Sequence, residues 1–167
     1  MLPLGHAATA YLCYVGYAAV STHRLPARLA LLSLFLGSQL PDVMDKPLAY
    51  WNVLTYDRSL AHSVFSFLLI SALVWWAGRR LQGRWNRTTW QDRIRLTAPA
   101  GLAIGYGSHL LGDSYRAVLT GQYADARFIF YPLYTMAESP TDEVPPWLRL
   151  LQIYQNMEIH PYIEIIV

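Results

Sequence analysis

The stretch GYGSHLLGDSYR, residues 105–116, places His109 and Asp113 four residues apart in a segment that is otherwise suited to the inside of a membrane. Side chains at positions i and i+4 lie on the same face of an α-helix, so an imidazole nitrogen and a carboxylate oxygen can reach one metal ion from a rigid support. A hydrogen bond within the helix is the simpler reading of the same pair. Gly101 and Gly105 form a small-xxx-small pair, which lets this helix approach a neighbouring helix closely.

The composition of the whole chain indicates a membrane-embedded protein. Of its 167 residues, 54% are hydrophobic and only 14% are charged, unlike an ordinary soluble domain. The length predicts a single domain over residues 1–167, with a core over residues 1–120 and a C-terminal interfacial extension over residues 121–167. The single cysteine, Cys13, excludes a disulfide within the monomer, and we expect no cleavable signal peptide.

Four apolar segments have about the length that a membrane-spanning helix needs: residues 3–20, 27–41, 62–78 and 96–113. The expected fold class is all-α, a polytopic membrane helix bundle with about four transmembrane helices plus a C-terminal amphipathic helix. We expect Pro41 to close the second helix and Pro99 to lie in the first turn of the fourth, because proline breaks a helix interior.

The C-terminal part of the chain predicts no further crossing. FIFYPLY, residues 128–134, is too short to span a bilayer and predicts a buried or interfacial segment. Beyond it, apolar residues recur at near-helical spacing and predict an amphipathic helix, which either lies on the outer membrane surface or packs against the bundle. These residues are Trp147, Leu148, Leu150, Leu151, Tyr154 and Met157.

The arginines predict the orientation in the membrane. Arg24 and Arg28 follow the first segment, and a basic cluster follows the third: Arg79, Arg80, Arg84, Arg87, Arg93 and Arg95. Basic loops between apolar segments are typical of the cytoplasmic side, so we expect the lipid bilayer, and no nucleic acid, as a partner. The chain is then a multi-pass cell-membrane protein whose N-terminus and residues 41–61 are extracytoplasmic.

On this topology six ionisable residues lie at the extracytoplasmic ends of the helices: His6, Asp42, Asp45, His62, His109 and Asp113. The orientation came from arginines and segment lengths alone, so the convergence is an independent observation. Imidazole nitrogen and carboxylate oxygen suit Zn²⁺, and mixed sets also accept Mn²⁺ or Fe²⁺. A lone carboxylate is costly near a bilayer, and one divalent ion offsets several. The pattern predicts a metal site at the extracytoplasmic end.

Single residues of this set also have simpler interpretations. His6 could be a histidine at the membrane interface, and Asp42 could be a turn residue that caps a helix. His62 could be a neighbour of a helix cap.

Two cations are candidates for binding an anion. Arg58 precedes His62 by four residues, and a guanidinium beside a metal can clamp a phosphate with two hydrogen bonds. Arg58 is equally suited to anchoring at the interface or pairing with Asp57. Lys46 is the second candidate. Three aromatic residues fit a belt around the entrance better than direct contact with substrate: Tyr50, Trp51 and Tyr56.

Four short motifs, in this order, resemble the membrane-bound metal-dependent hydrolases of the YdjM type: LGH (residues 4–6), LPDVMD (40–45), RSLAHS (58–63) and SHLLGD (108–113). That family is in turn similar to the zinc-dependent phospholipase C and P1-nuclease superfamily, whose all-helical members bind zinc through a His-x-x-x-Asp helix. The resemblance implies that Asp113 bridges two ions and that His6 serves one of them. It implies that Asp42, His62 and His109 complete the site of the other. Residues 114–127 lack the further histidines of the soluble enzymes, so we expect one or two ions.

The expected function is that of a membrane-bound metal-dependent hydrolase, which uses metal-activated water on a phosphoester such as a phospholipid head group. Asp42 or Asp45, whichever is not fully engaged as a ligand, is the expected general base, and Arg58 is the expected substrate contact. The alternatives are a metal-binding or transport protein without hydrolytic activity, and a structural protein whose ion only holds the helices together.

Overall fold

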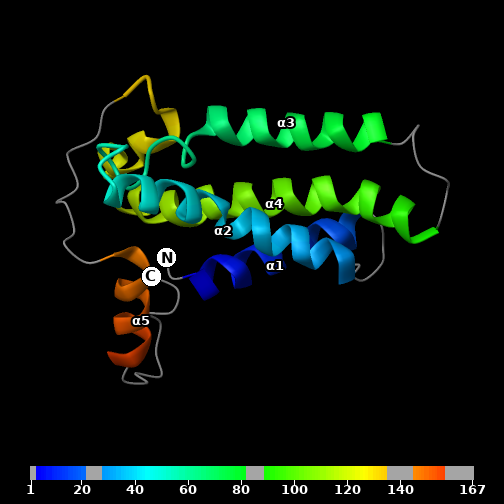
Figure 1. The fold of residues 1–167 in the computed structure, drawn as a ribbon, viewed down its shortest axis with the longest axis horizontal. Coiled ribbons are helices and arrows are strands. Elements are labelled where there is room, and N and C mark those ends of the chain that lie inside the picture. The colour runs from blue at the N-terminus through cyan, green and yellow to red at the C-terminus, as the bar shows by residue number, and fades with distance from the viewer. Residues whose placement is uncertain (1–2, 22–27, 82–88, 135–144, 157–167) are drawn as a thin grey trace.

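The computed structural model describes residues 3–21, 28–81, 89–134 and 145–156, and over these residues it is all-α (Figure 1). Its elements are α1 (Pro3–Ser21), α2 (Arg28–Tyr50), α3 (Val64–Leu81), α4 (Thr89–Thr120), the 3₁₀-helix η1 (Tyr123–Phe130) and α5 (Pro146–Asn156). The predicted all-α fold class is confirmed. Each of the four predicted apolar segments falls on one of the helices α1 to α4.

The helices α1 to α4 alternate in direction along the long axis of the molecule (Figure 1). One end of the bundle therefore gathers the start of α1, the end of α2, the start of α3 and the end of α4. These four places are the ones where the sequence carries its candidate metal ligands. The opposite end holds the C-terminal turn of α3, with Arg79 and Arg80.

Two predicted helix bounds were wrong. Pro41 does not close the second helix, because α2 continues through Pro41 and Pro47 to Tyr50. Pro99 does not lie in a first turn, because α4 begins at Thr89 and contains Pro99 in its interior. An interior proline removes one backbone hydrogen bond and costs about 3 kcal/mol, which extensive packing of α2 along α4 can offset.

Glycines set how closely α2 and α4 approach. A Cβ atom added to Gly105 would overlap the carbonyl oxygen of Leu34, and one added to Gly37 would overlap that of Leu102. A Cβ atom on Gly101 would collide with the side chain of Ser33. The predicted close approach through Gly101 and Gly105 is therefore present, and α2 is the neighbour.

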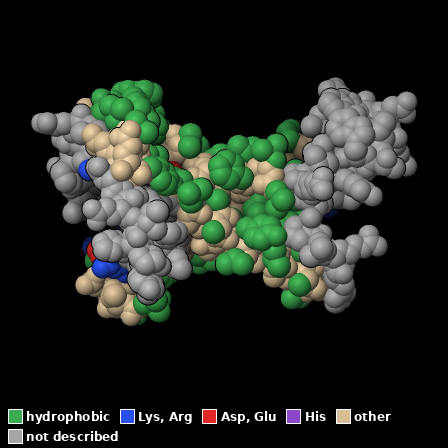
Figure 2. Space-filling view, turned by 90° about the horizontal axis from the view of Figure 1, so that it is seen from below, with side chains coloured by type: hydrophobic (Ala, Val, Ile, Leu, Met, Phe, Trp, Pro, Cys, Tyr) green, Lys and Arg blue, Asp and Glu red, His purple; other side chains and the backbone are tan. Residues whose placement is uncertain are grey.

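The core between these helices is small and contains many polar groups. Tyr106 and Phe128 are the largest fully buried side chains, and buried serines and histidines lie around them. Most of the large aliphatic and aromatic side chains of α3 are exposed instead, although Phe67 packs against Tyr106. The face drawn in Figure 2 lies on the side away from α3, and hydrophobic side chains are exposed there as well. Within the described residues, none of the helices combines the length and the apolar character that crossing a membrane requires.

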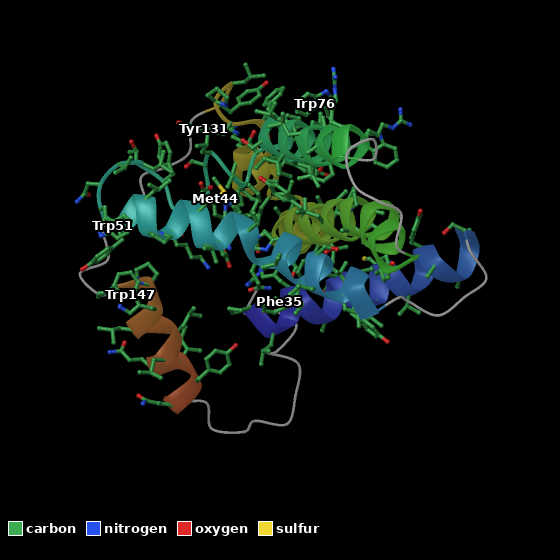
Figure 3. All side chains as sticks on the ribbon, turned by 45° about the vertical axis from the view of Figure 1, so that its right-hand side comes forward. Phe35, Met44, Trp51, Trp76, Tyr131 and Trp147 are labelled. Carbon is green, nitrogen blue, oxygen red and sulfur yellow. The ribbon has the colours of Figure 1, made fainter. Side chains whose placement is uncertain are left out.

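The C-terminal elements lie at the end of the bundle where α2 finishes. In η1, Phe128 is fully buried, whereas Phe130, Leu133 and Tyr134 of the segment predicted to be buried or interfacial are exposed. Helix α5 occurs where the amphipathic helix was predicted, although Met157 lies outside the described residues. Trp147 on α5 meets the ring of Tyr50 edge to face at 5.7 Å, and Figure 3 shows it near Trp51, just beyond α2.

Candidate metal centre

Five of the six predicted ligand residues form one buried cluster at the end of the bundle. His6 comes from the first turns of α1, Asp42 from α2, His62 from the loop before α3, and His109 and Asp113 from α4. His62 and His109 are fully buried, and the other three side chains are at most 10% exposed. Two overlapping groups have ligand atoms that all lie within 4.8 Å of one another: His6, His109 and Asp113, and Asp42, His62 and His109.

The local structure places His62 and fixes its ring. Ser63 caps α3 by accepting a hydrogen bond from the backbone N–H of Phe65 at 3.1 Å, so His62 sits just before the helix. Asp45 is fully buried and accepts backbone hydrogen bonds from Ser59, Ala61 and His62. It also accepts one from Nδ1 of His62 at 2.8 Å. The Nδ1 atom therefore carries the proton, and Nε2 is directed into the cluster.

Asp45 itself lies in neither of the two groups. Its carboxylate accepts hydrogen bonds from backbone N–H groups and from His62. Asp45 therefore contacts the candidate ligand His62 without being a candidate ligand itself. The sequence pattern, with Asp42 and Asp45 three residues apart on one helix, did not separate these two positions.

The ring of His109 is fixed in the same way by α2. Its Nδ1 lies 2.6 Å from the carbonyl oxygen of Ser38, which can only accept, so Nδ1 carries the proton. The close approach at Gly105 brings Ser38 within reach, since a Cβ there would also collide with the backbone of Ser38. Sequence reasoning missed Ser38, because a backbone carbonyl leaves no signal in residue type.

With these two ring orientations, hydrogen-bond acceptor atoms face one another inside the cluster. The Nε2 atoms of His62 and His109 lie 3.3 Å apart, and with both Nδ1 atoms protonated each neutral ring would point a lone pair at the other. Oδ1 of Asp42 lies 3.4 Å from Nε2 of His62 and 3.8 Å from that of His109. All three atoms are acceptors, so a positive charge, either a proton or a metal ion, has to lie among them.

The pKa of His62 is shifted in the direction that favours a positive charge in the cluster. Burial alone would lower the pKa of His62, but hydrogen bonds to Asp42 and Asp45, together with their negative charges, raise it above its usual value. A cation bound at Nε2 would take the place of that proton. The donor set of two imidazoles and a carboxylate is one that zinc accepts, with a further position left for water or substrate.

The second group is arranged around Asp113. Oδ1 of Asp113 lies 3.3 Å from Nε2 of His6, and Oδ2 lies 3.6 Å and 3.7 Å from Nε2 of His62 and His109. The ring of His6 stacks on that of His109 at 3.7 Å, and neither of its nitrogen atoms makes a hydrogen bond although the side chain is buried. Unsatisfied buried nitrogen atoms are costly, so a cation or a proton is favoured here as well.

Two partly exposed cations border the centre. Nε of Arg58 lies 3.2 Å from Oδ2 of Asp113, and the guanidinium lies over the ring of Phe128 at 5.7 Å. Nζ of Lys46 lies 2.9 Å from Oδ2 of Asp42. Phe128 also packs edge to face against His62 at 6.0 Å. The sequence predicted that FIFYPLY is a buried or interfacial segment, but not that Phe128 packs against the histidine.

The remaining predicted residues lie outside the cluster. Trp51 is exposed, and Tyr50 packs against α5. Tyr56 is half-buried and contacts Ser59 through its carbonyl oxygen. Several of the arginines that predicted the orientation lie outside the described residues or have side chains that the structure does not describe: Arg24, Arg28, Arg84, Arg87, Arg93 and Arg95.

Comparison with known proteins gives one match. A family model described as YdjM inner membrane protein matches residues 1–154 of the chain. No curated protein and no solved structure matches it. The comparisons therefore support the predicted family and a membrane location, but they give no support to the more distant likeness to zinc-dependent phospholipase C and P1 nuclease.

Proposed function

We propose, from the premise that the chain belongs to the YdjM inner membrane protein family, that it is a membrane-bound metal-dependent hydrolase acting on a phosphoester, such as a phospholipid head group. The observation that carries this proposal is the pair of Nε2 atoms of His62 and His109, 3.3 Å apart with both Nδ1 atoms already engaged. This arrangement attracts a divalent ion, for which Zn²⁺ is the best fit and Mn²⁺ or Fe²⁺ are alternatives.

In this proposal, His62, His109 and Asp42 hold the ion, and His6 with Asp113 extends the centre. A divalent ion supplies a Lewis acid that polarises the phosphoryl oxygen and lowers the pKa of a coordinated water toward neutrality. The protein contributes orientation, because the Asp45 and Ser38 hydrogen bonds hold both imidazoles with Nε2 inward. Burial excludes bulk water from the ligands and strengthens their interaction with the ion.

The structure also bears on the choice of general base. Asp45 was one of two candidates, but its oxygen atoms accept hydrogen bonds from three backbone N–H groups and from His62. It has little capacity left to accept a proton from water. Asp42 is a ligand in this proposal, with Oδ1 toward the imidazoles and Oδ2 next to Lys46, so its carboxylate is engaged as well and we assign the role of general base to neither residue.

We further propose that α1 to α4 are embedded in the bilayer as a multi-pass bundle, with the N-terminus and the metal centre on the extracytoplasmic side. The support is the distribution of charge at the far end of α3. There Arg79 and Arg80 lie over the rings of Trp75 and Trp76 at 5.3 Å and 5.5 Å, a combination typical of a cytoplasmic membrane interface.

A metal count tests the first step of the proposal. The wild-type protein, purified in detergent and loaded with zinc, should retain one or two ions per chain by elemental analysis. His109→Ala should lose most of this metal, because His109 belongs to both groups. Asp125→Ala, which removes an exposed carboxylate on η1, is the matched control and should retain it. Unchanged metal content in His109→Ala would show that this cluster does not bind the metal.

Turnover tests the second step. The zinc-loaded protein should release phosphate-containing products from phospholipids or soluble phosphodiesters, and a chelator should stop the reaction. Retained metal without turnover on any phosphoester would favour the alternative, a metal-binding or structural membrane protein.

A further inference from the structure

We propose that the centre holds one metal ion and that Arg58 acts as its second cation, binding the phosphate of the substrate beside that ion. This inference rests on the proposed function and deepens it, since it names the group that recognises the phosphoester. It differs from a two-ion centre, in which a second metal would contact the phosphate at the position that we give to Arg58.

The number of ions follows from the lone pairs of His109. Both candidate groups need His109, but its Nδ1 donates to the Ser38 carbonyl, so only the lone pair on Nε2 remains for a metal. That lone pair faces Nε2 of His62 at 3.3 Å. When it is used in the group of His62 and Asp42, the other group keeps only His6 and Asp113, which is too few ligands for a tightly bound ion.

The position of Arg58 follows from the oxygen that it contacts. Its Nε lies 3.2 Å from Oδ2 of Asp113, the same oxygen that lies 3.6 Å and 3.7 Å from the Nε2 atoms of the two central histidines. The same oxygen atom, Oδ2 of Asp113, is therefore close both to the guanidinium of Arg58 and to the Nε2 atoms of His62 and His109. Its stacking over Phe128 holds it there, and its planar donors suit a tetrahedral oxyanion.

Lys46 provides a contrast within the same centre. It is a cation of similar exposure, 32% against 37% for Arg58, and it also pairs with a candidate ligand carboxylate. However, it contacts Oδ2 of Asp42, whereas Oδ1 of that carboxylate faces the histidines. Lys46 is thus placed on the outer side of its carboxylate, and Arg58 on the inner side of Asp113.

The charges of the centre agree with an anionic substrate. Asp42, Asp45 and Asp113 carry three negative charges, against two positive charges on Lys46 and Arg58. One divalent ion turns this into an excess of one positive charge, which the single negative charge of a phosphodiester neutralises. A second divalent ion would leave the centre strongly positive after the diester has bound.

Phosphate binding to the cobalt-loaded protein in detergent tests the proposal. Inorganic phosphate and a soluble short-chain phosphatidyl lipid are titrated separately, with calorimetry and the visible absorption of Co²⁺ as readouts. We expect one ion per chain. We expect Arg58→Gln to weaken binding about tenfold or more, as loss of a charge-assisted hydrogen bond does. Lys46→Gln is the matched control and should weaken binding by no more than about threefold, as for an exposed ion pair.

Arg58→Lys covers the case in which Arg58→Gln loses its metal. It keeps a positive charge next to Asp113 but lacks the planar fork, so it should retain the ion and still bind phosphate more weakly than the wild type. The two titrants separate the sources of the ligand: preference for the phosphatidyl lipid indicates a head group, and preference for inorganic phosphate indicates a free anion.

Three results would overturn the proposal. They are two tightly bound ions per chain, equal losses of phosphate affinity in Arg58→Gln and Lys46→Gln, or a phosphate affinity that is unchanged in Arg58→Gln. These results are distinct from failure of the proposed function. Binding of phosphate that depends on Arg58, without turnover of any ester, would support the Arg58 subsite and contradict the hydrolase function. Turnover with an unchanged KM in Arg58→Gln would support the hydrolase function and contradict the Arg58 subsite.

Discussion

Helices α3 and α4 have similar apolar stretches in the sequence, but they occupy opposite environments in the fold. Exposed side chains on α3 include Leu69 at 61% and Trp76 at 57%. In α4, Tyr106, Ser108 and His109 are buried, and Gly101 and Gly105 lie against the backbone of α2. The more hydrophobic of the two helices is thus the more exposed one.

This contrast shows what marks a buried helix in this protein. In the bilayer that we propose as the surroundings of the bundle, the lipid is as apolar as leucine, so burial of large aliphatic side chains would not drive helices together. Small residues permit close backbone contact, and polar groups that must find partners favour the inside. The helices α2 and α4 have both features, and α3 has neither over most of its length. The candidate metal ligands lie on these two helices, on the loop that leads into α3, and at the start of α1.

The largest effect should follow from removing the buried acceptor on α2. Asp45→Ala leaves three backbone N–H groups and Nδ1 of His62 without their partner, so we expect a loss of about 3–5 kcal/mol in the free energy of unfolding. Denaturant titration in detergent, followed by tryptophan fluorescence, measures this change. Asp45→Asn keeps one acceptor oxygen and should lose less. Equal stability of Asp45→Ala and the wild type would show that α2 is not held by this network.

The next effect concerns the contact between α2 and α4. Gly105→Ala should lower the free energy of unfolding by about 1–3 kcal/mol, because the new methyl group overlaps the backbone of Leu34. Gly107→Ala is the matched control on the same helix, since a Cβ there meets only the ring of Phe67 at 3.6 Å. It should be neutral or stabilise by up to about 1 kcal/mol, through helix propensity. If both variants behave alike, close approach does not define the buried pair.

Removal of the metal should affect the same end of the bundle. A ligand that binds only the folded state at a hundred times its dissociation constant stabilises by about 2.7 kcal/mol. Zinc should therefore raise the unfolding midpoint of the wild type, and a chelator should cancel this rise. His109→Ala should show neither response, because it lacks the residue shared by both ligand groups. A stabilising response to zinc that persists in His109→Ala would place the ion elsewhere.

The sequence predicted the presence and order of the four main helices, because long apolar runs and their breakers are local signals. It predicted two helix bounds wrongly at Pro41 and Pro99, since tertiary contacts can offset the cost of an interior proline. It also identified the residues that meet at one end of the bundle, because alternating helices bring the ends of distant segments together. The division of labour between Asp42 and Asp45 was not predictable, since it depends on which backbone N–H groups the loop 51–63 presents.

The smallest effect should come from the exposed face of α3. Leu69→Ser should change the free energy of unfolding in detergent by no more than about 0.5 kcal/mol, because the side chain is 61% exposed and makes few contacts within the protein. Leu110→Ala on α4 is the comparison, because Leu110 is only 7% exposed and its truncation should cost about 2–5 kcal/mol. Denaturant titrations of the two variants under one detergent condition measure both values. A large loss in Leu69→Ser would mean that another surface covers α3, and the contrast between the two helices would then reflect a missing partner and not two environments within one chain.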